Sequence, residues 1–136
     1  MTSQVADKII IKGVSYPLFT NPLDEYWTKK NPKPAVGMTV TSCWRGYIAT
    51  WEIIDNVLCL VDIIFYTPDG EAGLDYIFPQ FIGKIKAVWF SGKLRIPIGN
   101  CLRYVHGGYD SVYESDLIIR IRRGIVKSQR TKTNHQ

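Results

Sequence analysis

Residues 47–64 read YIATWEIIDNVLCLVDII, two apolar runs that meet at Asp55-Asn56. A two-residue hairpin turn needs positive φ, which Asn and Asp tolerate better than most residues. The stretch therefore predicts an antiparallel hairpin, and its cross-strand pairs would be Ile54–Val57, Trp51–Leu60 and Tyr47–Ile64. Both faces of this hairpin are mainly apolar, which is typical of a strand pair that lies centrally in a fold.

The same arrangement of two apolar runs around a short turn recurs at Lys12-Gly13, Ser91-Gly92 and Arg123-Gly124. Around Ser91-Gly92, one register places Trp89 with Leu94, Ala87 with Ile96 and Ile85 with Ile98 on an apolar face, and Lys86, Val88, Phe90, Lys93, Arg95 and Pro97 on the other. Pro97 cannot donate to a strand ladder, so residues 94–98 are expected to form an edge strand.

Asn21-Pro22 followed by acidic residues predicts a short helix, which the prolines at positions 32 and 34 would end. The expected fold is therefore mainly β, with antiparallel hairpins forming a sandwich or partly open barrel and one short helix near residues 22–29. We expect a single domain over residues 1–136, with residues 1–7 and 130–136 disordered because both ends are polar.

The composition, with 46% hydrophobic and 21% charged residues among 136, is typical of a globular chain. No apolar run approaches the roughly 20 residues of a membrane span, and the first residues lack the pattern of a signal peptide. We therefore expect a cytoplasmic protein with no membrane partner.

Cysteine occurs three times, as Cys43, Cys59 and Cys101, without a CxxC pair. This spacing predicts neither a disulfide framework nor a zinc site, and the three side chains are expected to act as small hydrophobes. The sequence predicts no metal and no cofactor.

Catalysis would need a titrating group, and the two histidines are His106, in a glycine-rich loop, and His135, near the end. A nucleophilic pair of Cys43 and His106 is conceivable, but no oxyanion-hole motif accompanies it. Glu52 and Asp62 fall on opposite faces in the predicted register, which disfavours a shared acid/base site. An enzyme centred on His106 is accordingly the third of three hypotheses.

Loop-borne aromatic and arginine residues give the leading hypothesis, a non-enzymatic binding or accessory domain for a protein or small-molecule ligand. Such residues combine rigid apolar area with a polar end, and binding residues concentrate on loops. The predicted ligand-binding residues are Trp44, Arg45, Tyr104, His106 and Tyr109. If the second and third hairpins pack side by side, these residues converge on one concave surface at one end of the sheet.

The net charge of +5 is concentrated in residues 118–136, which contain six basic residues and no acid. A second hypothesis is therefore a nucleic-acid-binding β domain that uses Arg120, Arg122 and Lys127. The alternative is a solvated tail without a partner. Arg120 would face Lys127, and this like-charge pair predicts a short fourth hairpin.

Three segments resemble a set of small bacterial proteins without an assigned activity. They are CWRGYIATWEI at 43–53, LRIP at 94–97 and YVHGGY at 104–109. The resemblance spans about residues 40–126 and implies a bacterial or phage origin. It implies no catalytic role for any residue.

Overall fold

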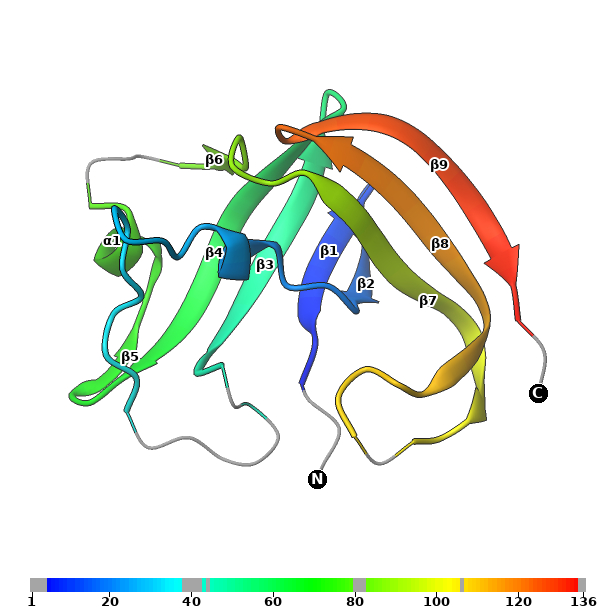
Figure 1. Cartoon of the computed structure of the whole chain (residues 1–136), viewed down its shortest axis with the longest axis horizontal. Helices are drawn as coiled ribbons and strands as arrows, with labels where there is room; N and C mark the ends of the chain where they lie inside the picture. Colours follow the sequence, from blue (N-terminus) through cyan, green and yellow to red (C-terminus); the bar gives the residue numbers. More distant parts are fainter. Residues whose placement is uncertain (1–4, 38–42, 44, 80–82, 106, 135–136) are drawn as a thin grey trace.

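The computed structural model describes residues 5–37, 43, 45–79, 83–105 and 107–134, and it is mainly β (Figure 1). The strands are β1 (Asp7–Ile11), β2 (Val14–Leu18), β3 (Tyr47–Ile54), β4 (Val57–Thr67), β5 (Gly70–Ala72), β6 (Ile85–Lys86), β7 (Gly92–Arg103), β8 (Val112–Arg122) and β9 (Ile125–Thr133). The helical elements are the 3₁₀ turn η1 (Pro22–Glu25) and α1 (Leu74–Ile77). Neither helical element in this part of the chain is long and apolar enough to cross a membrane.

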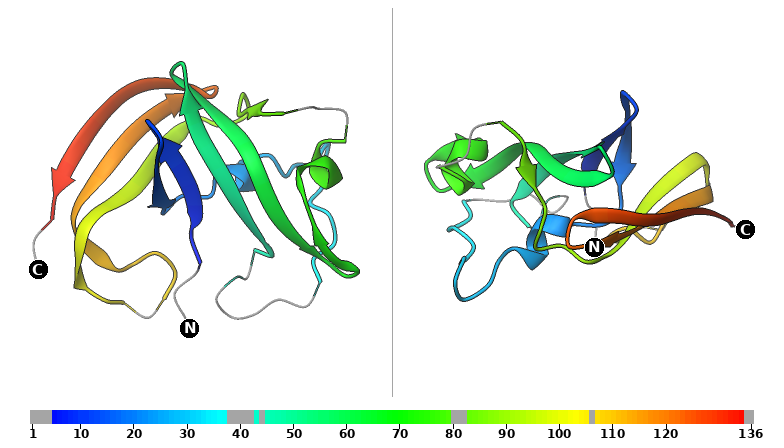
Figure 2. Two further views of the ribbon diagram at one scale, coloured as in Figure 1. Left: turned by 180° about the vertical axis from the view of Figure 1, so that it is seen from behind. Right: turned by 90° about the horizontal axis from the view of Figure 1, so that it is seen from above.

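The strands form one mixed sheet in the order β2-β1-β3-β4-β9-β8-β7, with β5 and β6 added beside β4. β1 and β3 are parallel, and the remaining pairs are antiparallel. The sheet curves, as the two views in Figure 2 show, without closing into a barrel. This confirms the predicted class, a mainly β fold with a short helical element at Pro22.

The β3–β4 hairpin turns at Asp55-Asn56, where φ is 51° and 62° as predicted. Trp51 faces Leu60, but a bulge between Thr50 and Trp51 then shifts the register, so that Tyr47 faces Phe65 and Asp62 lies opposite Thr50. The predicted placement of Glu52 and Asp62 on opposite faces is therefore wrong. Thr50 and Glu52 are alternate residues of β3 and share a face, and Asp62 lies on that same face because it pairs with Thr50.

The hairpin predicted around Ser91-Gly92 does not form. β6 pairs with β4, and β7 pairs with β8 through Leu94 and Ile119. Between them the chain turns at residues 87–90, where the Phe90 amide donates to the Ala87 carbonyl at 3.0 Å. Ala87, Leu94 and Ile96 are buried as predicted, but Phe90, which was expected on the polar face, is buried too. β7 lies at the end of the sheet order, as Pro97 predicts.

The β8–β9 hairpin is longer than the like charges predicted. A bulge between Arg120 and Ile121 places Arg120 opposite Ser128 instead of Lys127, which separates the two cations. Pairing then continues to Thr133, and the Asn134 side chain donates to the Tyr113 carbonyl at 3.0 Å. The expected disorder from residue 130 is thus corrected for residues 130–134, and at the other end of the chain Asp7 is a buried strand residue.

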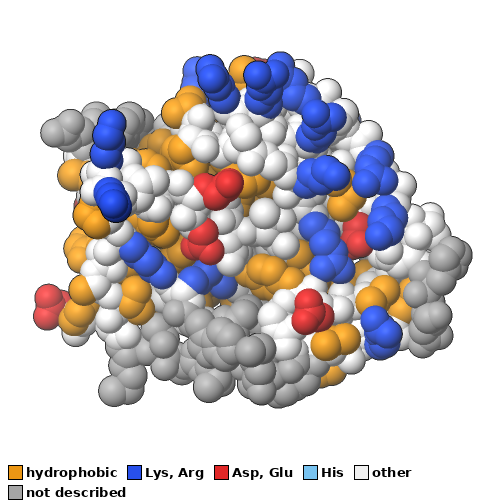
Figure 3. All heavy atoms as spheres, viewed as in Figure 1, with side chains coloured by type: hydrophobic (Ala, Val, Ile, Leu, Met, Phe, Trp, Pro, Cys, Tyr) orange, Lys and Arg blue, Asp and Glu red, His pale blue; other side chains and the backbone are white. Residues whose placement is uncertain are grey.

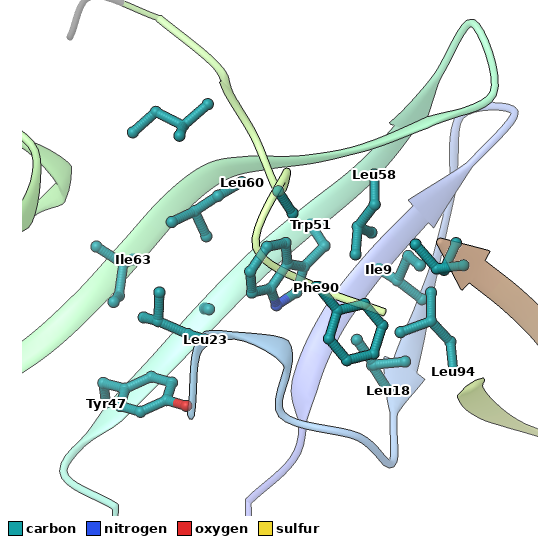
Figure 4. Packing of buried hydrophobic residues seen from close by; sticks show 14 of the residues in the cluster. Ile9, Leu18, Leu23, Tyr47, Trp51, Leu58, Leu60, Ile63, Phe90 and Leu94 are labelled. Carbon is teal, nitrogen blue, oxygen red and sulfur yellow. The ribbon is translucent and has the colours of Figure 1, made fainter. Parts of the chain in front are cut away.

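One apolar core lies between the β1–β3–β4 part of the sheet and the β7–β8 part. Figure 4 shows Trp51 near its centre, with Leu58, Leu60 and Phe90 around it. Leu94 and Ile119 complete the core from the opposite strands, and both are fully buried. The apolar runs of the sequence therefore supply this core from segments far apart in the chain.

Candidate functional site

A groove of about 420 Å³ opens beside β6 and is bordered by aromatic rings. We call it the aromatic groove, and its lining residues are Tyr26, Phe78, Lys84, Ile85, Lys86, Val88 and Trp89. They come from three separate segments: the residue that follows η1, the end of α1, and β6 with the turn after it. The fold therefore assembles this site from positions that are distant in sequence.

Ring contacts hold the floor of the aromatic groove in place. Tyr26 and Trp89 meet edge to face with ring centroids 4.8 Å apart, and Phe78 stacks on Trp89 at 6.1 Å. The Trp89 Nε1–H donates to the Pro22 carbonyl at 3.0 Å, which leaves the indole ring fixed against η1. A ligand would meet rings that are already oriented, which lowers the entropy cost of binding.

The rim of the aromatic groove is apolar and positive. Val88 is 64% exposed, a high value for a large hydrophobic residue. Lys84 and Lys86 are the charged residues of the lining, and no acidic residue accompanies them there. Burial raises the pKa of the neighbouring Cys59 thiol, while the charges of Lys84 and Lys86 act in the opposite direction. Glu52 and Asp55 also act on this thiol and raise its pKa, so the two lysines supply the charge of the described lining while acids lie nearby.

A buried ion pair lies at the start of β1 and β3. Asp7 is fully buried, and its carboxylate accepts from Arg45 Nη2 at 2.6 Å, from the Ala49 amide at 3.0 Å and from Trp51 Nε1 at 3.0 Å. Burial raises the pKa of Asp7, and Arg45 and the two N–H donors oppose that rise. Because every one of these partners belongs to the fold, this carboxylate has a structural role.

Arg45 was predicted to bind ligand, and the structure gives its guanidinium other partners. It bonds Asp7, donates from Nη1 to the Val5 carbonyl at 2.8 Å, and lies over the Tyr47 ring at 5.1 Å. Tyr47 in turn donates its hydroxyl to Asp24 at 2.6 Å, and burial raises the Tyr47 pKa well above its ordinary value. Arg45 Nε is buried and has no hydrogen-bond partner among the described residues.

Tyr109, another predicted ligand residue, lies at the same end of the sheet as Arg45. Its hydroxyl donates to Asn21 Oδ1 at 2.8 Å, and its ring stacks on Phe19 at 5.0 Å. Burial raises the Tyr109 pKa, while the nearby charge of Arg45 lowers it. The two predicted loops therefore come near each other at residues 45 and 109, where the two side chains act on each other electrostatically. Of the other predicted residues, Tyr104 is 64% exposed, and Trp44 and His106 lie outside the described residues.

Arg95 organises the loop before β8, a role that the sequence did not indicate. Its Nε donates to Asp116 at 3.1 Å, its Nη1 to the Tyr109 carbonyl at 2.7 Å and its Nη2 to the Ser111 carbonyl at 3.1 Å. The guanidinium also lies over the Phe19 ring at 5.2 Å. Each guanidinium nitrogen donates to a partner in the protein. Arg95 therefore positions Tyr109, and its guanidinium is not free to bind a ligand.

The three cysteines have different surroundings, since Cys43 and Cys59 are buried and Cys101 is exposed. The described residues contain no group of His, Cys, Asp and Glu side chains that would hold a metal ion. The conceivable Cys43–His106 pair depends on a histidine outside the described residues, so it stays a prediction.

The outer side of β7, β8 and β9 carries a second candidate surface, which we call the basic face. Strand pairing puts Arg120 between Lys93 and Ser128, Arg130 opposite Ile118, and Lys132 opposite Asp116. The members of the basic face are Lys93, Arg120, Arg122, Arg130 and Lys132. Figure 3 shows Lys and Arg side chains along these strands. Of the residues predicted to bind nucleic acid, Arg120 and Arg122 lie on this face, and Lys127 lines a hollow of about 230 Å³ with Arg122, Arg123 and Ile125.

Comparison with known proteins adds no relative, because no family model, no curated protein and no solved structure matches the chain. The aromatic groove and the basic face are therefore the features of this chain that can indicate a function, and the bacterial origin stays a prediction.

Proposed function

We propose that this protein is a non-enzymatic binding domain whose aromatic groove holds a planar apolar group that carries a negative charge. The observation that supports this most directly is the ring floor of Tyr26, Phe78 and Trp89, with Lys84 and Lys86 in the same lining. The proposal retains the binding class predicted from the sequence and moves the site to other aromatic residues.

The size and composition of the aromatic groove suit a small ligand or one side group of a larger one. Ligand pockets usually measure about 300–1,000 Å³ and are mainly apolar with few polar groups. A volume of about 420 Å³ lies in the lower part of that range. Aromatic rings favour a planar partner through offset stacking or edge contacts, and ammonium groups select a negative charge.

Binding is favoured over catalysis because the described lining of the groove has no carboxylate, histidine or thiol, and its titratable side chains are Tyr26, Lys84 and Lys86. Three of the buried titratable groups elsewhere in the described residues are occupied by the fold: Asp7 by Arg45, Asp116 by Arg95, and Tyr47 by Asp24. An acid/base mechanism would need a group within hydrogen-bond reach of the bound substrate. A site made of rings and ammonium groups instead supplies shape, apolar contact and charge.

The experiment titrates the protein with anilinonaphthalene sulfonate, a planar anionic dye, and follows the dye fluorescence. Val88→Asp adds a negative charge at the groove rim and is expected to weaken dye binding at least about tenfold, a change of about 1.4 kcal/mol. The matched control is Val14→Asp, at a residue that is 50% exposed in β2, which should bind the dye as the unchanged protein does. Equal binding by both variants would contradict the proposal.

The lysines are tested by the double variant Lys84→Gln, Lys86→Gln. Removing both charges should weaken binding of the sulfonate dye more than binding of an uncharged naphthalene, because only the dye carries an anion that the ammonium groups attract. Added salt should reproduce part of that difference. If the two probes weaken equally, the lysines contribute apolar contact and the charge selection in this proposal is wrong.

A further inference from the structure

We infer that the protein binds single-stranded nucleic acid, with an unpaired base in the aromatic groove and the phosphodiester backbone along the basic face. The inference depends on the proposed function, because it names an unpaired base as the planar group and the phosphate next to it as the negative charge. It adds a second surface, the basic face, and so assigns the ligand as a polymer.

The charges of the basic face form no ion pair within the part of the chain that the structure describes. The described residues form two ion pairs, Arg45–Asp7 and Arg95–Asp116, and neither includes a member of the basic face. Asp116 is the acid closest to this face in the strand register, and Arg95 and Asn134 already engage its two oxygens. Among the described residues no acid forms an ion pair with any of these five cations, and Asp116, which lies opposite Lys132, is already engaged. The resulting excess of positive charge is the electrostatic condition for binding a polyanion.

The aromatic groove and the basic face are joined by the turn between β8 and β9. The Arg123 amide donates to Ser91 Oγ at 2.9 Å, and the Gly124 amide donates to the Phe90 carbonyl at 2.9 Å. Trp89 of the groove is thus next to a residue that bonds the basic hairpin, and Lys93 begins the face a few residues later. Figure 3 shows the apolar area near β6 and the Lys and Arg side chains over β7–β9 on the same side of the molecule.

The dimensions also suit a short single strand. β9 has 9 residues, which extend over about 30 Å at about 3.3 Å each. Single-stranded binding domains of the β class typically cover about 4–16 nucleotides and combine a basic track with rings that stack on bases. A base in a duplex is already stacked and paired, so the aromatic groove gives a reason to prefer a single strand.

An acidic protein segment would also be attracted by the basic face, but it would leave the ring floor of the groove without a planar partner. A single strand satisfies both surfaces, since its phosphates meet the cations and its bases have the planar faces that rings stack on. The observations therefore favour nucleic acid over an acidic peptide, and the experiment below includes both.

The first measurement is fluorescence anisotropy of a labelled 12-nucleotide oligothymidylate at 50 mM and at 200 mM salt. With 3–5 phosphates neutralised, the association constant should fall roughly 20- to 100-fold over this range. A 12-base-pair duplex and an abasic strand of the same length should each bind more weakly than the oligothymidylate. Polyglutamate of equal charge should compete poorly.

The second measurement separates the two surfaces by substitution. Arg120→Gln with Arg130→Gln should reduce the salt slope by about 1.4 and weaken the strand. The control Lys8→Gln with Lys12→Gln makes the same change in net charge at two exposed residues of the β1–β2 hairpin, and should leave binding nearly unchanged. Val88→Asp should remove the advantage of the oligothymidylate over the abasic strand.

Several results would overturn the inference. Binding of the sulfonate dye without binding of the oligothymidylate would overturn it while leaving the proposed function in place. Equal affinity for the abasic strand would show that no base enters the aromatic groove. Tighter binding of the duplex, or full competition by polyglutamate, would assign the basic face to a different partner.

Discussion

Arg45, just before β3, and Arg130, in β9, are the same residue type in opposite environments. Arg45 is buried, lies 2.6 Å from a carboxylate and is flanked by an aromatic ring. Arg130 is exposed on a face of like charges, and it forms no ion pair with any described residue. The first guanidinium holds the fold together, while the second is one of the charges that the proposed nucleic-acid strand would contact.

The comparison shows how the cost of each charge identifies its role. A buried charge loses its hydration and needs partners in the fold to replace it. Removing one charge of a buried pair leaves the other unpaired and costs much stability. An exposed cation beside other cations adds only weak repulsion, which water and salt screen. A face that carries several such cations gains no stability from them, which is consistent with the proposed role in binding.

The largest effect is expected for Asp7→Ala, which leaves Arg45 and Trp51 Nε1 buried without their acceptor. The free energy of unfolding should fall by about 3–5 kcal/mol, measured by urea denaturation followed by circular dichroism. The control Glu71→Ala removes an exposed acid of β5 and should change stability by less than about 0.5 kcal/mol. A loss below about 1 kcal/mol for Asp7→Ala would place that carboxylate in water and remove the contrast with the basic face.

The next effect concerns the attachment of the basic hairpin to the groove. Gly124 has φ +83°, and a Cβ there would lie 2.8 Å from the Ala87 carbonyl oxygen. Gly124→Ala should therefore cost about 1–3 kcal/mol in urea denaturation. Gly13→Ala is the matched control, because φ is +80° and no atom lies within 4 Å of its added Cβ. Equal losses would mean that only backbone strain matters at Gly124, and that the turn is not packed against residue 87.

A smaller effect is expected for Tyr47→Phe, which removes the 2.6 Å hydrogen bond to Asp24 and keeps the ring under Arg45. The loss should be about 1 kcal/mol, the usual net value of one hydrogen bond. Thermal unfolding of Tyr76→Phe, at an exposed residue of α1, provides the comparison and should show little change. If both variants behave alike, the Tyr47 hydroxyl adds nothing to the buried end.

The smallest effect is expected for Arg120→Gln with Arg130→Gln. Stability should stay within about 0.5 kcal/mol of the unchanged protein, and it should rise slightly at low salt because repulsion is relieved. Thermal unfolding at two salt concentrations measures this difference. A clear loss of stability would show that these arginines support the fold, as Arg45 does, and would weaken the argument for a binding face.

The sequence predicts the local parts of the fold well where backbone conformation is decided by neighbouring residues. Asp55-Asn56, Lys12-Gly13 and Arg123-Gly124 all form the expected turns at positive φ. The turn at Ser91 fails because distant residues compete for its strands: β4 takes Ile85, and β8 takes Leu94. The two bulges, at Thr50 and at Arg120, shift registers that alternation alone predicts to be regular.

The candidate site was harder to predict for the same reason. Tyr26, Phe78 and Trp89 come from three segments, and nothing in their local sequence indicates that they meet. Trp89 was assigned to the inner face of a hairpin that does not form, so its position in the groove was missed. Alternation within one hairpin did place Arg120 and Arg122 together, because that face depends only on strand periodicity.

The sheet is held together unevenly along its length. One seam lies between β4 and β9, which share a single residue pair, Val57 with Ile125. The other lies between the end of β2 and β7, where the Phe19 amide donates one backbone hydrogen bond to the Arg95 carbonyl at 2.8 Å. Most of the resistance to separation at these two seams must come from the apolar core between them, since few ladder bonds cross there. A variant that loosens the core should therefore weaken these two seams before it weakens the ladders within either half.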